Sequence, residues 1–318
     1  MPQTMSFQPL GQHGFEVSRI ALGCMGLAGT WNPAEVGDEH RRKAIASVQT
    51  ALEAGINFFD HADIYGGTAC ESIFKDCLAA LKPGRESLFI ATKVGIRSGC
   101  YDHSPDYIRT SVEGSLKRLG IEYIDLYQLH RPDPLSHPGE TAEVLTALMQ
   151  EGKIRDIGVS NYYPNQANAL IAYLEAPLVT NQFEFSLLHL DPLYEGREGQ
   201  GGDGVLDYCM ENELTPLAYS PVGRGWLSGR RTVPEDHVQK ERFERVVAAL
   251  DGMSAAYDGA TATQIALAWI LAHPAGIIPL VGSNNPEHIR EAAAAHRIEL
   301  SRTDWYKLWV ASRGARVP

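Results

Sequence analysis

The sequence is poor in cysteine and has no long apolar segment. Its 318 residues include five cysteines, and no two of them form a Cys-x-x-Cys pair. This argues against a disulfide framework and against a zinc ribbon. The first ten residues lack a basic start and an apolar core, and nowhere are 18 consecutive residues apolar. We therefore expect neither a signal peptide nor a membrane helix, and we expect a cytoplasmic protein.

Positive charge is also scarce. Lysine and arginine total 28 against 39 aspartates and glutamates, which gives a formal net charge of −11. The densest basic cluster, at 41–43, opens a helical pattern, where a solvated helix face is expected. Nucleic acids and anionic membranes bind through clustered basic residues, so we expect neither as a partner. Apolar residues make up 44% and charged residues 21%, which excludes a disordered chain.

A regular alternation of strand and helix patterns fills the rest of the chain. Eight short apolar runs predict strands at 19–23, 56–59, 88–92, 123–129, 154–159, 178–181, 215–219 and 277–281. Helical patterns follow them at 39–54, 70–81, 105–119, 139–151, 164–174, 205–212, 235–257 with 261–272, and 286–295. A length of 318 residues allows two ordinary domains or one large barrel. Eight units without a linker predict a single (β/α)8 TIM barrel domain over 1–318, with a hairpin at 7–17 closing its N-terminal mouth.

Ionisable residues stand where three successive strands end. Asp60, Lys93 and His130 each follow an apolar run, and Tyr65 comes five residues after Asp60. Each one alone has an ordinary structural interpretation, such as a helix cap or a surface lysine. Because the carboxyl ends of parallel barrel strands share one face, however, we expect the four to meet there. Three long loops, at 26–38, 131–138 and 186–204, should reach the same face.

These four residue types suit the reduction of a carbonyl group. An aspartate keeps a lysine charged, and the ammonium is expected to lower the pKa of the tyrosine from its usual value of ~10. Such a tyrosine can act as a general acid, while a histidine orients the carbonyl oxygen. The set supplies no electrons, so a hydride-donating cofactor is needed.

Other motifs are weaker. Gly199-x-Gly201-x-x-Gly204 matches a dinucleotide-binding pattern but follows a polar loop and not a strand, so we interpret it as a flexible loop. His61 and Asp63 alone are too few for a metal site, so no metal is expected and a metal-dependent barrel hydrolase is disfavoured. Arg131, Asp133 and His137 fit either a polar, sugar-like ligand or a solvated loop.

Taken together, these residues make the chain resemble the aldo-keto reductase family. The similarity runs from Leu10-Gly11 and Leu22-Gly23 through the Asp-His-Ala-Asp-Ile-Tyr-Gly run at 60–66 to Ile-Pro-Leu-Val-Gly-Ser at 278–283. The resemblance implies a (β/α)8 barrel that reduces aldehydes or ketones with NAD(P)H, or catalyses the reverse reaction. It makes Asp60, Tyr65, Lys93 and His130 the catalytic tetrad. Trp31 is expected beside the small-molecule carbonyl or alcohol substrate, together with Tyr65 and His130.

The resemblance also implies where the cofactor lies. Ser160, Asn161 and Gln182 would hold the nicotinamide carboxamide, and Tyr219 would stack on the ring. The loop at 220–225 would wrap the pyrophosphate, and 282–284 would place phosphate at a helix N-terminus. The full set of implied cofactor contacts is Gly23, Met25, Asp60, Ser160, Asn161, Gln182, Tyr219, Ser220, Pro221, Val222, Gly223, Arg224, Gly225, Gly282, Ser283, Asn284, His288 and Glu291.

The chain departs from a common family pattern at two of these positions. Many members have a lysine before the serine that matches Ser283 and an arginine at the position of His288, and both bind the 2′-phosphate of NADPH. This chain has Gly282 and His288 there. NADP(H) is still the expected cofactor, and NAD(H) is the alternative. A second alternative is a non-catalytic nicotinamide-nucleotide-binding accessory subunit. The sequence leaves the substrate, the reaction direction and the oligomeric state open.

Overall fold

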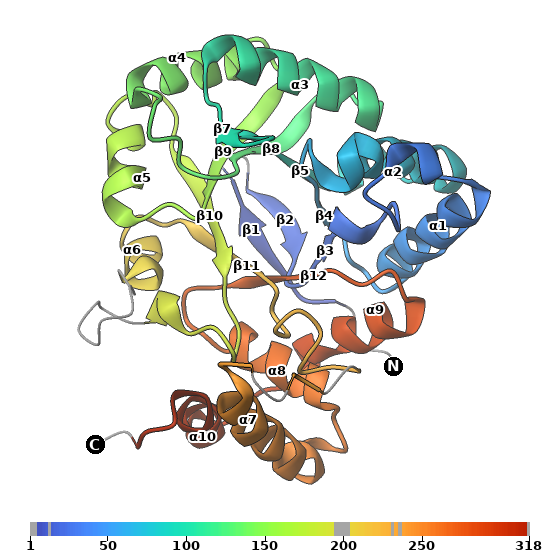
Figure 1. The fold of residues 1–318 in the computed structure, drawn as a ribbon, viewed down its shortest axis with the longest axis vertical. Helices are drawn as coiled ribbons and strands as arrows, with labels where there is room; N and C mark the ends of the chain where they lie inside the picture. The colour runs from blue at the N-terminus through green and yellow to red at the C-terminus, as the bar shows by residue number, and fades with distance from the viewer. Residues whose placement is uncertain (1–4, 12–13, 194–203, 230–231, 235–236, 317–318) are drawn as a thin grey trace.

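Eight parallel strands close into a barrel, with helices packed around its outside (Figure 1). The computed structural model describes residues 5–11, 14–193, 204–229, 232–234 and 237–316. Neighbouring strands follow chain order, and the last strand pairs with the first, which confirms the predicted (β/α)8 barrel. The barrel strands are β3 (Ala21–Gly23), β4 (Phe58–Asp60), β5 (Phe89–Val94), β8 (Ile124–Leu129), β9 (Ile154–Ser160), β10 (Leu178–Glu184), β11 (Thr215–Tyr219) and β12 (Ile278–Val281).

The helices occupy the predicted positions between these strands. None of those in the described residues is long and apolar enough to span a membrane. Glycines end two of them, because Gly55 (φ +84°) and Gly120 (φ +67°) adopt the left-handed conformation just past the helix. The helices are α1 (Asp38–Glu53), α2 (Ala69–Leu81), α3 (Pro105–Leu119), α4 (Pro138–Gln150), α5 (Pro164–Ile171), α6 (Val205–Glu211), α7 (Lys240–Met253), α8 (Ala262–Leu271), α9 (Pro286–Ala293) and α10 (Arg302–Arg313).

The barrel interior is apolar at its N-terminal end. Strand alternation turns Phe58, Phe89 and Leu126 inward, where they form one buried cluster with the hairpin residues Leu10 and Val17. The hairpin consists of β1 (Phe7–Leu10) and β2 (Phe15–Ser18). Its Gln8 and Glu16 are hydrogen-bonded to residues just before β12 and β4. The hairpin therefore closes the N-terminal mouth, as predicted.

Some elements differ from the prediction. α10 was not predicted, because it follows no strand and lies outside the strand–helix alternation. Its ends nevertheless carry ordinary signals, since the Ser301 side chain caps the amide of Asp304 and Gly314 has φ +77°. A small hairpin of β6 (Ile96–Arg97) and β7 (Cys100–Tyr101) was also missed. α7 begins at Lys240 and not at 235, and residues 235 and 236 lie outside the described residues, as do Gly199 and Gly201.

The closely packed interior predicts a strong effect at Gly158 of β9. A Cβ atom there would lie 2.2 Å from Thr180 Oγ1 and 3.0 Å from Gln128 Cγ, both on neighbouring strands. We expect Gly158→Ala to lower the free energy of unfolding by about 1–3 kcal/mol, measured by urea denaturation. Gly252→Ala is the matched control, because Gly252 lies in α7 with no atom within 4 Å of its would-be Cβ. That variant should be up to about 1 kcal/mol more stable. Equal midpoints for Gly158→Ala and wild type would contradict the expectation.

Candidate active site

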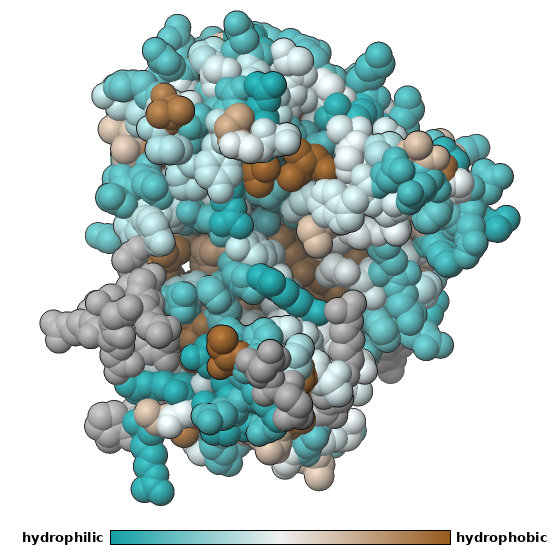
Figure 2. All heavy atoms as spheres, viewed as in Figure 1, coloured by the Kyte–Doolittle hydropathy of each residue, from teal (hydrophilic) through white to brown (hydrophobic). Residues whose placement is uncertain are grey.

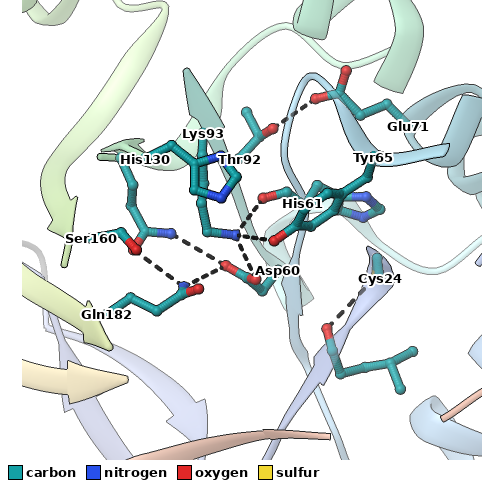
Figure 3. Close-up of polar contacts among 12 residues, drawn as sticks. Cys24, Asp60, His61, Tyr65, Glu71, Thr92, Lys93, His130, Ser160 and Gln182 are labelled. Atoms are coloured by element: carbon teal, nitrogen blue, oxygen red, sulfur yellow. Dashed lines mark hydrogen bonds and ion pairs between the residues drawn. The ribbon is translucent and has the colours of Figure 1, made fainter. Parts of the chain in front are cut away.

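Three neighbouring strands bring four polar side chains together at the C-terminal end of the barrel. Asp60 ends β4, Lys93 lies in β5, and His130 directly follows β8. Tyr65 begins the short 3-10 helix η3 (Tyr65–Thr68) that follows β4. Figure 3 shows these side chains converging on one point. The structure thus brings together the four residues that the sequence predicted.

The Lys93 ammonium is the centre of this cluster. It is fully buried and donates three hydrogen bonds, to Asp60 Oδ2 at 2.6 Å, the carbonyl oxygen of His61 at 2.7 Å and the hydroxyl oxygen of Tyr65 at 3.2 Å. A lysine has three N–H donors, so all of them are used. Although burial opposes the charged form, Asp60 and Tyr65 raise the pKa of Lys93 above its ordinary value. The amine therefore stays protonated at neutral pH.

Asp60 is held by more groups than the lysine alone. Its second oxygen, Oδ1, accepts a hydrogen bond from Gln182 Nε2 at 3.0 Å (Figure 3). It also accepts one from Gln128 Nε2 at 3.2 Å. Three donors from three different strands fix the orientation of this buried carboxylate. Gln128 was not among the predicted site residues, although a glutamine inside the apolar run 124–129 indicates a buried polar side chain.

The pKa of Tyr65 differs from the sequence-based expectation. Burial raises it above its ordinary value, and the opposing effect of the Lys93 charge is not large enough to reverse this. The expectation of a lowered pKa was therefore wrong, because it considered the ammonium and not the loss of water around the phenol. Since Lys93 donates to the phenol oxygen, the phenol's own hydrogen must point to another acceptor. Tyr65 is thus a protonated hydrogen-bond donor at neutral pH.

His130 is a neutral imidazole. Burial, with the charges of Lys93 and Arg131, lowers its pKa to about 2. Its ring lies edge-on to that of Tyr65, with centroids 5.9 Å apart. Within the described residues neither ring nitrogen makes a hydrogen bond. One N–H of the ring is therefore free to act on a ligand beside Tyr65.

The loop between Asp60 and Tyr65 is fastened to its surroundings by Asp63. The Asp63 amide donates to the carbonyl of Lys93 at 3.1 Å, and its carboxylate accepts from Ser111 of α3 at 2.8 Å. Its other oxygen, Oδ1, is buried without a partner, and burial raises the pKa of this carboxyl to about 6. His61 is also buried, which lowers its pKa to about 3. No cluster that could hold a metal ion exists among the described residues.

The residues expected to hold a carboxamide lie next to this cluster. Asn161 Nδ2 donates to Ser160 Oγ at 2.8 Å, and Asn161 Oδ1 accepts from the Tyr219 hydroxyl at 2.9 Å. Gln182 is connected to the Lys93 cluster, because its side chain donates a hydrogen bond to Asp60. Asn161 has φ +59°, a left-handed conformation that is uncommon for a residue other than glycine and is frequent at functional sites.

The turn at 220–225 has an unusual backbone. Ser220 (φ +51°) and Arg224 (φ +56°) are left-handed without being glycine, and Gly223 and Gly225 also have positive φ. Within the described chain, the amides of Val222 and Arg224 make no hydrogen bond. Amides presented in this way form a concave site suited to phosphate oxygens. Pro221 lies within the same turn.

The remaining predicted cofactor residues gather where β12 meets β3. Gly23 lies against Gly282, whose Cα is 3.7 Å from a would-be Cβ on Gly23. Asn284 is hydrogen-bonded to the carbonyl of Gly26, near Met25. Ser283 precedes α9, which also carries His288 on its exposed surface. Glu291 accepts a hydrogen bond from Thr261 at 2.6 Å, so one of its oxygens is already used.

A cleft of about 830 Å³ opens beside the Lys93 cluster, over the loops that follow β8, β9 and β10. Its lining includes Asn161 and Tyr219, from the group expected to hold a carboxamide, but neither Tyr65 nor His130. Trp31 does not line it either; this side chain is 61% exposed on the loop before α1. Sequence reasoning missed the cleft's Tyr101, because β7 itself was not predicted.

Comparison with known proteins gives consistent matches over the whole chain. Residues 19–309 match the model of the aldo/keto reductase family. A 6-dehydroglucose reductase of Novosphingobium aromaticivorans is 41% identical over 327 aligned residues, covering 100% of this chain and 99% of the relative. A 6-dehydroglucose reductase of Agrobacterium fabrum is 36% identical, covering 95% and 97%. The structure of a glycerol dehydrogenase from Gluconobacter oxydans superimposes with a TM-score of 0.83 at 25% identity, covering 98% of each chain.

The raised pKa of Asp63 predicts a particular pH dependence of stability. Between about pH 4 and pH 6 the folded state keeps a proton on Asp63 that the unfolded state releases, so this residue lowers stability as the pH rises. Asp63→Asn removes the effect. The quantity to compare is the free energy of unfolding of Asp63→Asn minus that of wild type, both measured by urea denaturation. This difference should be about 2 kcal/mol higher at pH 7 than at pH 4.

Ser111→Ala provides a second test of the same contact. The Ser111 hydroxyl favours the ionised carboxylate, so its loss should raise the pKa of Asp63 further. The pH range over which Asp63 lowers stability should then extend to higher pH. A difference between Asp63→Asn and wild type that does not change with pH would show that Asp63 ionises equally in both states.

Proposed function

This chain belongs to the aldo/keto reductase family, and on that premise we propose that it reduces an aldehyde or ketone with NAD(P)H, using Tyr65 as the proton donor. The observation that carries the proposal is the Lys93 ammonium, which donates to the Tyr65 hydroxyl oxygen from a fully buried position. This arrangement leaves the phenolic hydrogen free and places a positive charge beside the oxygen that will lose it.

Each residue has a defined part in the proton transfer. Tyr65 gives its hydrogen to the carbonyl oxygen, and the phenolate that results is stabilised by Lys93. Asp60 keeps the ammonium charged and in position. The neutral His130 donates its N–H to the carbonyl oxygen and so orients it. When bound, the reduced nicotinamide cofactor supplies the hydride to the carbonyl carbon.

The described residues fit such a cofactor. Asn161 and Ser160 offer donors and acceptors to a carboxamide, beside the ring of Tyr219. The unused amides of Val222 and Arg224 suit the pyrophosphate. Ser283 and the N-terminus of α9 suit a further phosphate, such as the 2′-phosphate of NADP(H). We therefore propose NADP(H) as the preferred cofactor. NAD(H) is the alternative, because Gly282 and His288 replace two cations common in the family.

The names of related proteins support a small carbonyl or alcohol as the substrate. The two reductases above are named for an oxidised sugar and the structural neighbour for glycerol. All three names describe interconversion of a carbonyl and an alcohol on a short, hydroxylated carbon chain. We propose the same type of reaction here, on a soluble small molecule.

Removing the Tyr65 hydroxyl should strongly reduce turnover and leave cofactor binding unchanged. We expect Tyr65→Phe to lower kcat by about 10²–10⁴-fold, because the proton donor is lost. Quenching of tryptophan fluorescence by NADPH should be unchanged, since Tyr65 does not hold the cofactor. Tyr173→Phe, which removes the hydroxyl of an exposed tyrosine, is the matched control. Retained turnover in Tyr65→Phe would overturn the assignment. Cofactor binding by the wild type without reduction of any aldehyde or ketone would instead favour an accessory subunit.

Cofactor choice can be tested at His288. We expect NADPH to bind more tightly than NADH in fluorescence titrations, with a difference that shrinks as salt is added. His288→Arg should tighten NADPH by about tenfold, because a guanidinium pairs well with phosphate, and should leave NADH unchanged. Equal tightening of both cofactors would show that position 288 does not face the 2′-phosphate.

A further inference from the structure

We propose that the cleft beside Tyr219 binds the part of the substrate remote from the carbonyl, and that Arg131 makes it selective for uncharged, polyhydroxylated chains. The inference rests on the proposed function, because it assigns a substrate class to the same site. It is carried by the position of the cleft, by the chemistry of its lining and by the lack of a carboxylate partner for Arg131 among the described residues.

The cleft lies where a substrate would extend from the catalytic groups. Arg131 directly follows His130, and its charge acts on both His130 and the Tyr219 hydroxyl. Asn161 and Tyr219 form the inner wall. The residues proposed to hold the phosphates, at 220–225 and 282–288, do not line it. Figure 2 shows this face hollowed near its centre, with hydrophilic side chains along the edge.

The lining combines aromatic faces with both donors and acceptors. Tyr101, Tyr163 and Phe183 offer flat apolar surfaces, and Gln166, His189 and Asp191 offer polar atoms. A hydroxylated carbon chain matches both kinds of group, because each hydroxyl donates and accepts while the C–H groups pack on aromatic rings. A purely apolar aldehyde would desolvate the polar atoms without replacing their hydrogen bonds.

The acidic residues of the cleft each lie against polar neighbours of their own. Asp133 accepts from the amides of His103 and Leu135 and from Ser136, so it shapes the loop. Asp191 Oδ2 lies 3.6 Å from His189 Nε2. In the third acid, Glu184, Oε2 lies 3.5 Å from Arg224 Nη2. Three carboxylates on one lining nevertheless disfavour an anionic substrate.

Arg131 differs from these residues. Among the described residues it forms no ion pair with a carboxylate, although it lines a cleft that contains three. Arg131 is partly buried, and its guanidinium has more N–H donors than its contact with the Tyr219 hydroxyl uses, so donors remain for a ligand oxygen. A guanidinium in this position selects ligands that bring acceptor oxygens. The neighbouring carboxylates select those whose oxygens carry no negative charge.

The test compares three four-carbon aldehydes with the intact enzyme and NADPH. D-erythrose carries hydroxyls, butanal carries none, and succinic semialdehyde carries a carboxylate. We expect the wild type to have its highest kcat/KM for erythrose. In Arg131→Met the ratio of kcat/KM for erythrose to that for butanal should fall about tenfold or more, because a charged donor to the hydroxyls is lost. Arg42→Met, at an exposed position of α1, is the matched control and should leave the ratio unchanged.

Three outcomes would overturn the proposal. One is an equal loss of activity on all three aldehydes in Arg131→Met, since that would place Arg131 in the chemistry or the folding. Another is a preference of the wild type for succinic semialdehyde that is lost in Arg131→Met, which would make the cleft an anion site. The third is reduction of all aldehydes by the wild type without preference; the proposed function would then stand and this inference would fall.

A binding measurement keeps the two proposals separate. Tyr65→Phe with bound NADPH should bind meso-erythritol, the four-carbon polyol, as detected by ligand-observed NMR. Adding Arg131→Met should weaken this binding about tenfold. If erythritol does not bind, the cleft proposal fails whether or not the enzyme reduces aldehydes. If erythritol binds but no aldehyde is reduced by the wild type, the proposed function fails, and the cleft keeps its selectivity for a polyol without a role in substrate binding.

Discussion

The burial of one lysine ammonium inside the barrel determines how its C-terminal end is built. Lys93 is surrounded by Asp60, the carbonyl of His61 and the hydroxyl of Tyr65, and it contacts all three directly. A charge in such surroundings is tolerated only when it is paired and fully hydrogen-bonded. Asp60 must therefore be fixed in turn, by Gln128 and Gln182 from two further strands.

The barrel interior changes character along its axis as a result. Its N-terminal half contains Phe58, Phe89 and Leu126 and is covered by the hairpin. Further along the same strands, the inward positions are Asp60, Lys93 and Gln128. The apolar half provides the packing that stabilises the fold, while the polar half is held by hydrogen bonds between strands. Such a division agrees with the general location of barrel active sites at the carboxyl ends of the strands.

Much of this arrangement could be predicted from the sequence. The repeated strand and helix patterns identified the barrel, and polar residues at strand ends identified Asp60, Lys93 and His130, because both signals depend only on local periodicity. Some features escaped prediction because they depend on tertiary packing. Among them are the raised pKa of Tyr65 and the attachment of Asp63 to Ser111. α10, whose Trp305 ring stacks on that of Trp269 with centroids 5.1 Å apart, escaped because it lies outside the strand–helix alternation.

The pairing of β12 with β3 joins the two ends of the chain. Gly23 and Gly282 become neighbours only there, and Asn284 reaches the carbonyl of Gly26 across the same junction. A chain that is still being synthesised has the tetrad residues long before it has this junction. Part of the proposed cofactor site thus forms only when the last barrel strand is in place, and a bound cofactor would stabilise this junction against opening.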